Sequence, residues 1–71
     1  MNIKQQQIIN KNIELETLNK KLVALIFRRN EETAHNTVSL LTAREISETE
    51  KDISFLEKQI TQLEIEVQKN E

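Results

Sequence analysis

The sequence predicts an all-α protein in which two amphipathic helices form an antiparallel, coiled-coil-like hairpin. Three observations lead to this prediction. The 71 residues include no Gly and no Pro, the residues that most often form tight turns. Apolar residues recur every three or four positions in two segments, which is the period of a helix. The charge changes sign between them: residues 1–29 carry six basic and two acidic side chains, and residues 30–71 carry four and ten.

The first helix is predicted over about residues 3–29. Its main apolar stripe fits heptad positions a and d and consists of Ile8, Leu15, Leu18, Leu22 and Leu25. A second apolar face of the same helix holds Ile9, Ile13, Val23 and Phe27. A helix with two apolar faces usually has two neighbours, so we expect a bundle of more than two helices.

A turn is predicted at about residues 30–36, where the order Arg28-Arg29-Asn30-Glu31-Glu32 joins the two segments. Basic residues are favourable in the last turn of a helix and acidic residues in the first. Asn30 is a suitable cap for the second helix, and Asn30 and Asn36 both tolerate a left-handed backbone. The alternative is one continuous coiled-coil helix, which would be about 106 Å long.

The second helix is predicted over about residues 37–70. Its heptad positions a hold Ile46, Ile53, Ile60 and Val67, and its positions d hold Thr49, Leu56, Leu63 and Asn70. Seven of the eight flanking positions e and g are acidic, namely Glu45, Glu50, Asp52, Glu57, Glu64, Glu66 and Glu71. Two such helices would repel each other in parallel, so the basic first helix is the expected mate.

One hairpin of this size has only two short apolar stripes to bury, so we expect it to dimerise into a four-helix bundle. Six apolar residues outside the main stripes are predicted to contact a second copy or another protein: Ile9, Ile13, Val23, Phe27, Phe55 and Ile65. This pattern favours a non-enzymatic interaction module that acts as an adaptor, an assembly factor or an inhibitor of a larger protein.

Catalytic, cofactor and metal sites are not expected. His35, the single His, forms only an i,i+4 pair with Glu31, and zinc sites need three or four protein ligands. Without Gly there is no phosphate-binding loop. The longest apolar run, Leu22–Phe27, is far shorter than the ~20 residues that cross a membrane. The N-terminal residues lack the apolar core of a signal peptide, so a cytoplasmic protein is expected.

The second hypothesis is a nucleic-acid-binding regulator. Lys20, Lys21, Arg28 and Arg29 give the first helix its positive charge and are the candidate nucleic-acid contacts. The expected architecture resembles that of the plasmid copy-number regulator Rop, a helical hairpin that dimerises into a four-helix bundle and binds RNA. The likeness lies in the architecture alone, because no Rop motif occurs in the sequence.

Overall fold

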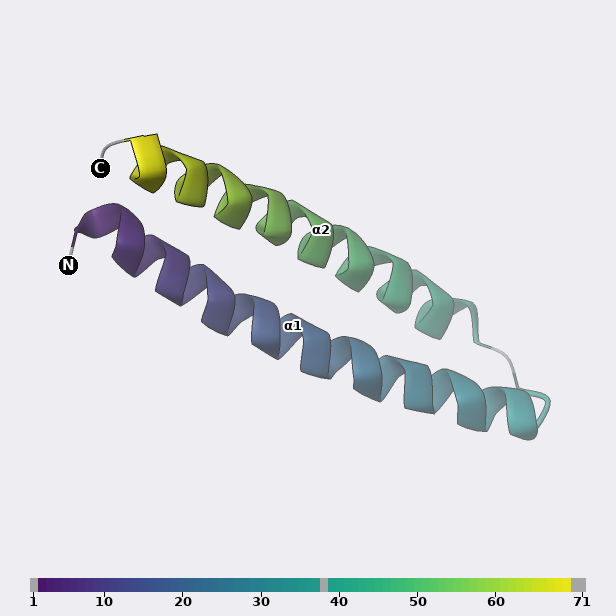
Figure 1. Ribbon diagram of the computed structural model, residues 1–71. Helices are drawn as coiled ribbons and strands as arrows, with labels where there is room; N and C mark the ends of the chain where they lie inside the picture. The colour runs from purple at the N-terminus through teal and green to yellow at the C-terminus, as the bar shows by residue number, and fades with distance from the viewer. Residues whose placement is uncertain (1, 38, 70–71) are drawn as a thin grey trace.

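The computed structural model describes residues 2–37 and 39–69, which form two helices that lie side by side (Figure 1). Helix α1 spans Ile3–Ala34 and helix α2 spans Leu40–Lys69. The start of α1 and the end of α2 lie at the same end of the molecule, so the helices run antiparallel. The Cα positions span 55 × 16 × 13 Å. The predicted hairpin is therefore confirmed, and the continuous helix of about 106 Å is wrong.

Helix α1 begins with a capping box formed by Asn2 and Gln5. The Asn2 side chain accepts a hydrogen bond from the backbone N–H of Gln5 at 2.8 Å, and the Gln5 side chain accepts one from the backbone N–H of Asn2 at 3.3 Å. This arrangement satisfies two backbone donors that would otherwise have no partner at the start of a helix.

The end of α1 lies five residues beyond the predicted one, because the chain turns at Asn36 rather than at Asn30. Asn36 has a left-handed backbone, with φ of 56°, and its N–H donates to the Thr33 carbonyl at 3.1 Å. The N–H of Thr37 donates to the Glu32 carbonyl at 2.7 Å. These two bonds form a Schellman motif, which satisfies carbonyls of the last helical turn. Asn30 lies inside α1 and caps nothing, so the predicted boundary was wrong.

Helix α2 begins at Leu40, three residues later than predicted, because Ser39 provides its cap. The Ser39 hydroxyl accepts a hydrogen bond from the backbone N–H of Thr42 at 3.4 Å, and the Ser39 carbonyl accepts from the N–H of Ala43 at 3.3 Å. Such a cap satisfies one of the free donors at the start of a helix. The predictions for residues 38, 70 and 71, including heptad positions Asn70 and Glu71, lie outside the described residues.

The core lies along the seam between the helices and follows the predicted heptads. Leu25, Ile46, Leu56 and Ile60 are buried, with 5–6% of their surface exposed. The other predicted core residues are half-buried: Ile8, Leu15, Leu18, Leu22, Ile53, Leu63 and Val67. Among the described residues the two most buried side chains are polar, Thr42 and Thr49, each 2% exposed. Thr42 occupies the d position one heptad before Thr49 and was not predicted as core.

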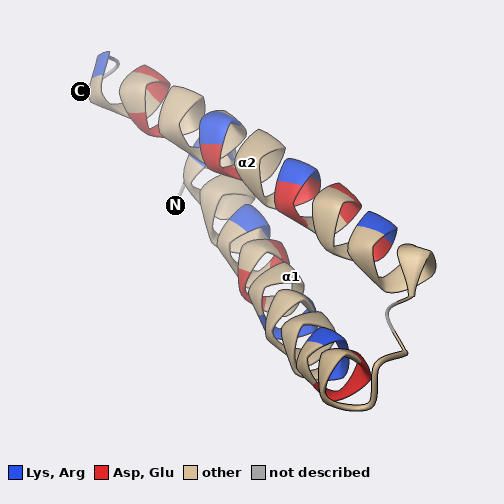
Figure 2. Cartoon of the chain, turned by 90° about the vertical axis from the view of Figure 1, so that its right-hand side faces the viewer, with Lys and Arg blue, Asp and Glu red and all other residues tan. Residues whose placement is uncertain are grey.

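Polar contacts across the seam join basic residues of α1 to position g of α2. Lys4 lies 3.4 Å from Glu66, and Arg28 lies 3.0 Å from Glu45. Lys11 donates to the Gln59 side chain at 3.2 Å. Figure 2 marks the positions of the basic and acidic residues along both helices. The predicted pairing of the basic helix with the acidic helix is confirmed, and because these pairs are partly exposed they select the partner more than they stabilise it.

Candidate interaction surfaces

An exposed apolar surface lies on α1, facing away from α2. It is formed by four residues that we call the outer stripe of α1: Ile9, Ile13, Val23 and Phe27. They are 41–65% exposed. All four were predicted from the sequence as contacts with another helix, and the structure places them along one line on the helix surface, at heptad positions b and f. Whether a partner covers them remains a prediction.

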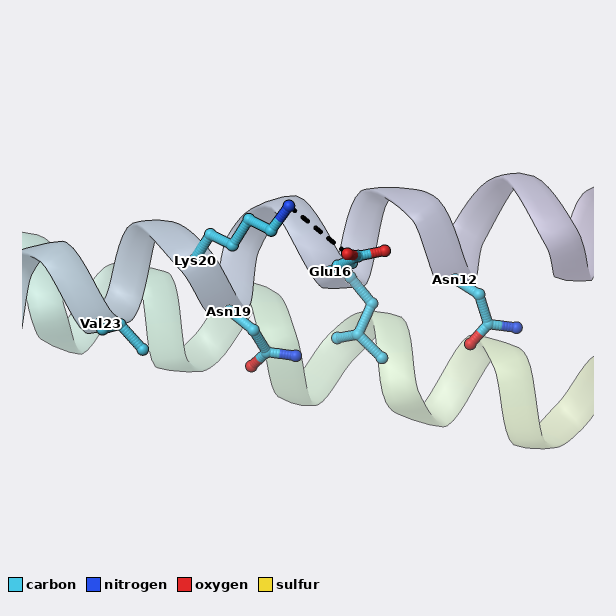
Figure 3. A pocket seen from close by; sticks show the side chains of 6 residues that line it. Asn12, Glu16, Asn19, Lys20 and Val23 are labelled. Atoms are coloured by element: carbon cyan, nitrogen blue, oxygen red, sulfur yellow. Dashed lines mark ion pairs between the residues drawn. The ribbon is translucent and has the colours of Figure 1, made fainter.

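Two shallow, open grooves follow this stripe. One is lined by Asn12, Leu15, Glu16, Asn19, Lys20 and Val23, and Figure 3 shows these side chains along one side of α1. The other is lined by Val23, Ile26, Phe27 and Asn30. Val23 belongs to both grooves, so they form one continuous strip of surface. Ile26 was missed by the heptad assignment because it lies at a flanking e position, where it is half-buried.

The centre of the strip is polar. Lys20 lies 3.5 Å from Glu16, and both side chains are more than two-thirds exposed (Figure 3). Between residues 9 and 27, Glu16 and Lys20 are the two charged residues at positions b, c, e and f of α1. The outer stripe therefore has two apolar pairs, Ile9/Ile13 and Val23/Phe27, separated by one acidic and one basic residue.

The exposed apolar residues of α2 are more scattered. Phe55 is 62% exposed and lies over the seam, where it lines grooves together with Lys11 and Gln59. Ile65, at 40% exposure, stands alone at an f position. Leu40 and Leu41 are exposed at the start of the helix. The structure does not join Phe55 and Ile65 to the outer stripe of α1, so the six predicted contact residues form at least two separate surfaces.

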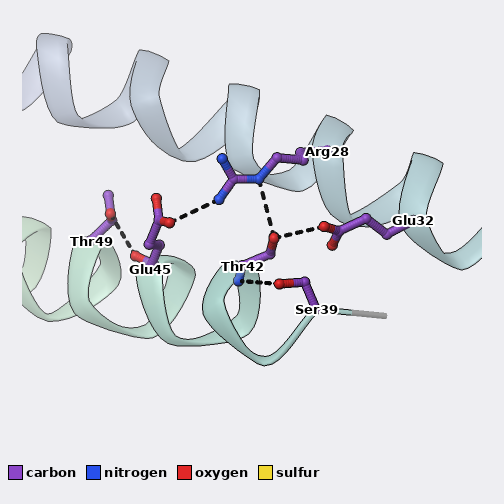
Figure 4. A network of polar contacts seen from close by, with 6 residues as sticks. All are labelled: Arg28, Glu32, Ser39, Thr42, Glu45 and Thr49. Carbon is purple, nitrogen blue, oxygen red and sulfur yellow. Dashed lines mark hydrogen bonds and ion pairs between the residues drawn. The ribbon is translucent and has the colours of Figure 1, made fainter. Parts of the chain in front are cut away.

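A network of polar side chains near the turn was not predicted (Figure 4). Its centre is Thr42, whose hydroxyl accepts a hydrogen bond from Arg28 Nε at 3.1 Å and donates one to Glu32 Oε2 at 3.0 Å. Arg28 also forms the ion pair with Glu45 across the seam. The second oxygen of Glu32, Oε1, is buried and accepts no hydrogen bond from the described residues.

This network joins the two helices. The Arg28 guanidinium lies between the Thr42 hydroxyl and the Glu45 carboxylate. The Thr42 hydroxyl lies between Arg28 and the Glu32 carboxylate. His35, the single imidazole, is exposed at the C-cap of α1. In the parts of the chain that the structure describes, no group of three or more His, Asp or Glu side chains could hold a metal ion.

The candidate nucleic-acid contacts are all exposed, but they do not form one face. Lys20 lies on the outer surface of α1, Lys21 and Arg28 lie at position g, and Arg29 lies at position a. Lys20 is paired with Glu16, and Arg28 with Glu45. The structure thus brings Lys21 and Arg28 to one side and separates Arg29 and Lys20 from them.

We expect a gel-shift experiment with duplex RNA or DNA to show no retardation at low salt. Nearby carboxylates weaken the positive potential of the four basic residues, and nonspecific binding depends on that potential. Retardation that weakens steeply as salt is added would contradict this expectation and support the nucleic-acid hypothesis. The variant Lys21→Glu would then separate a true contact from a general charge effect when compared with Lys58→Glu on α2.

Neither helix contains, within the described residues, a stretch long and apolar enough to cross a membrane. The chain matches no known protein family, and no curated protein or solved structure is significantly similar to it.

Proposed function

We propose that the chain is a non-enzymatic, cytoplasmic interaction module that binds other helices through its outer apolar surfaces. In this role it self-associates, most simply as a dimer, and serves as an adaptor, an assembly factor or an inhibitor of a larger protein. One observation carries the proposal: the six predicted contact residues remain 40–65% exposed although α1 and α2 already cover each other's inner faces.

The energetic argument starts from the cost of leaving apolar surface in water. Covering an exposed Val, Ile or Phe side chain completely stabilises a complex by roughly 1.5–3 kcal/mol. Val23 and Phe27 lie one turn apart on the same stripe, so one partner helix covers both. Partner helices are commonly bound by such anchors at i, i+3, i+4 and i+7. The exposed stripe therefore favours a helical partner.

The shape of the grooves beside α1 favours binding of a helix over binding of a small molecule. The grooves beside α1 are open and shallow, and each is formed by side chains of a single helix. Small-molecule sites are usually concave and bury most of the ligand. A helix laid along α1 needs no such enclosure, because it makes its contacts along the length of the stripe.

The proposal is tested by comparing three tagged proteins: the wild-type chain, Ile13→Asp/Val23→Asp and Phe55→Asp/Ile65→Asp. We expect the wild-type chain to sediment as more than a monomer, or to recover a defined host protein, and at least one variant to lose that association. All four substituted side chains are exposed, so the hairpin itself is expected to stay helical by circular dichroism.

The control adds the same charge elsewhere. Ala43→Asp/Ser47→Asp places two carboxylates at exposed e and b positions of α2, at least eight residues from Phe55 and Ile65 and away from the outer stripe of α1. This variant is expected to behave like the wild-type chain. If the wild-type chain is a monomer and recovers the same proteins as both apolar variants, the proposed function is wrong.

A further inference from the structure

The outer stripe of α1 has the spacing of a second coiled-coil seam. With Glu16 and Lys20 included, its members lie at residues 9, 13, 16, 20, 23 and 27, so the intervals alternate between four and three. This is the interval pattern of the a and d positions in a heptad repeat. One face of α1 thus packs on α2, and the opposite face presents an exposed line of residues with the same spacing.

The residues of this seam are symmetric about Leu18. Ile9 and Phe27 lie nine residues before and after it, and Ile13 and Val23 lie five residues before and after it. Glu16 and Lys20 lie two residues before and after it. When a second copy of the helix is placed antiparallel against this one, every apolar residue of the seam therefore faces an apolar residue, and the acidic residue faces the basic one.

We propose that the outer stripe of α1 is the interface between two copies of this chain, packed antiparallel about a two-fold axis beside Leu18. This inference rests on the proposed function and names the partner of that surface. In the dimer, Ile9 packs on Phe27 of the second copy, and Ile13 packs on Val23 of the second copy. Such mixed pairs satisfy the requirement that a two-fold interface be complementary to itself.

The charges select the antiparallel arrangement. In it, Glu16 of each copy faces Lys20 of the other, which gives two opposite-charge pairs at the centre of the interface. In a parallel arrangement Glu16 would face Glu16 of the second copy, and Lys20 would face Lys20, so both pairs would repel. The residues that flank the centre of the stripe are uncharged: Asn10, Asn12, Thr17, Asn19, Ala24 and Ile26.

The position of the axis favours the same arrangement. Helix α1 spans Ile3–Ala34, so Leu18 lies at its middle. Two copies centred there overlap along the whole helix, about 48 Å at 1.5 Å per residue. Helix α2 offers no comparable seam. Its exposed line of residues 51, 55, 58, 62, 65 and 69 holds two apolar residues, Phe55 and Ile65, and its three charged residues are all Lys, so they cannot form opposite-charge pairs with a second copy.

The first test uses cysteine cross-linking, which is clean because the chain has no cysteine. Gln6 and Asn30 are exposed and lie twelve residues before and after Leu18, on the line of the stripe. Mixing Q6C with N30C is expected to give a heterodimeric disulfide under mild oxidation. Q6C alone is expected to give little, because the two copies of residue 6 would lie about 36 Å apart in the antiparallel dimer.

The second test reverses charges. Glu16→Lys and Lys20→Glu each turn two attractive pairs into two repulsive pairs, so each is expected to raise the dimer Kd about 5- to 30-fold. The double variant Glu16→Lys/Lys20→Glu restores opposite charges across the interface and is expected to return the Kd to within about twofold of the wild-type value. In a parallel dimer the single variants would leave the number of repulsive pairs unchanged.

The matched control is a second exposed i,i+4 ion pair among the described residues, Arg44–Glu48 on α2, with a distance of 3.2 Å. Arg44→Glu and Glu48→Arg remove an equivalent pair within one helix without touching α1. Their dimer Kd is expected to equal that of the wild-type chain. If they weaken the dimer as much as the α1 variants do, the effect belongs to helix stability and the inference is overturned.

The outcomes separate this inference from the proposed function. Strong cross-linking of Q6C with itself, or loss of the dimer in Phe55→Asp/Ile65→Asp with no effect of Glu16→Lys, overturns the antiparallel α1 interface but leaves self-association standing. A wild-type chain that stays monomeric up to ~1 mM also overturns the inference. The proposed function is then decided by whether a host protein is recovered through the same surfaces.

Discussion

Leu56→Ala is expected to lower the free energy of unfolding by about 2–5 kcal/mol, enough to unfold much of a small two-helix protein. Leu56 is 5% exposed at the centre of α2 and is one of four buried apolar side chains in the described core. The loss combines the transfer free energy of the removed methyl groups with the cavity that they leave. Urea unfolding followed by circular dichroism at 222 nm measures the change.

Leu41→Ala is the matched control, because it makes the same substitution in the same helix. Leu41 is 63% exposed, so its truncation is expected to change the free energy of unfolding by less than about 0.5 kcal/mol. Both variants must be measured at one protein concentration, since self-association adds to the apparent stability. Equal losses in the two variants would show that the seam between α1 and α2 is not the core.

Thr42→Val is expected to lower the free energy of unfolding by about 1–3 kcal/mol, although the side chain keeps its size and stays buried. The valine neither accepts from Arg28 Nε nor donates to Glu32 Oε2. The Glu32 carboxylate, whose Oε1 already accepts no hydrogen bond from the described residues, would then lose its contact at Oε2 as well. Unsatisfied buried polar groups are the costly outcome of removing one partner.

Thr49→Val makes the same substitution at a position where no buried polar group is expected to lose its hydrogen-bond partner. Thr49 is as buried as Thr42, but its hydroxyl donates at 2.7 Å to the backbone carbonyl of Glu45, in its own helix. Because that bond does not join the helices, its loss is expected to be neutral within about 0.5 kcal/mol, or slightly stabilising. If Thr42→Val and Thr49→Val destabilise equally, the cross-helix network contributes nothing of its own.

The fold could be predicted from the sequence because it depends on the spacing of the apolar residues and on the distribution of charge. The spacing of Leu15, Leu22 and Leu25 identifies the buried face of α1, and the acidic flanks of α2 identify its mate. The same reasoning separates the outer stripe from the seam, since Val23 and Phe27 fall on another side of the helix. Each of these predictions uses only residue type and position along a regular helix.

The helix boundary and the Thr42 network could not be predicted from the sequence, because both depend on contacts that exist only in the folded chain. The helix boundary depends on which asparagine adopts the left-handed backbone, and Asn30 and Asn36 are equally suitable by residue type. The Thr42 network depends on side chains that are fourteen and ten residues away from it along the chain. Carrying the d positions of α2 back by one heptad would have identified Thr42 as buried, though not its partners.

The Thr42 network also has a consequence for the register of the hairpin. The apolar seam is built of Leu and Ile at repeating positions, so sliding one helix by a heptad would replace most contacts with similar ones. The hydroxyl of Thr42 between Arg28 and Glu32 has no such equivalent, because Thr49, one heptad further on, bonds to its own backbone. A polar residue at one core position is a recognised means of fixing alignment between helices. The polar network beside the turn thus favours one register of the two helices. The apolar residues of the seam hold the helices together but do not distinguish that register from others.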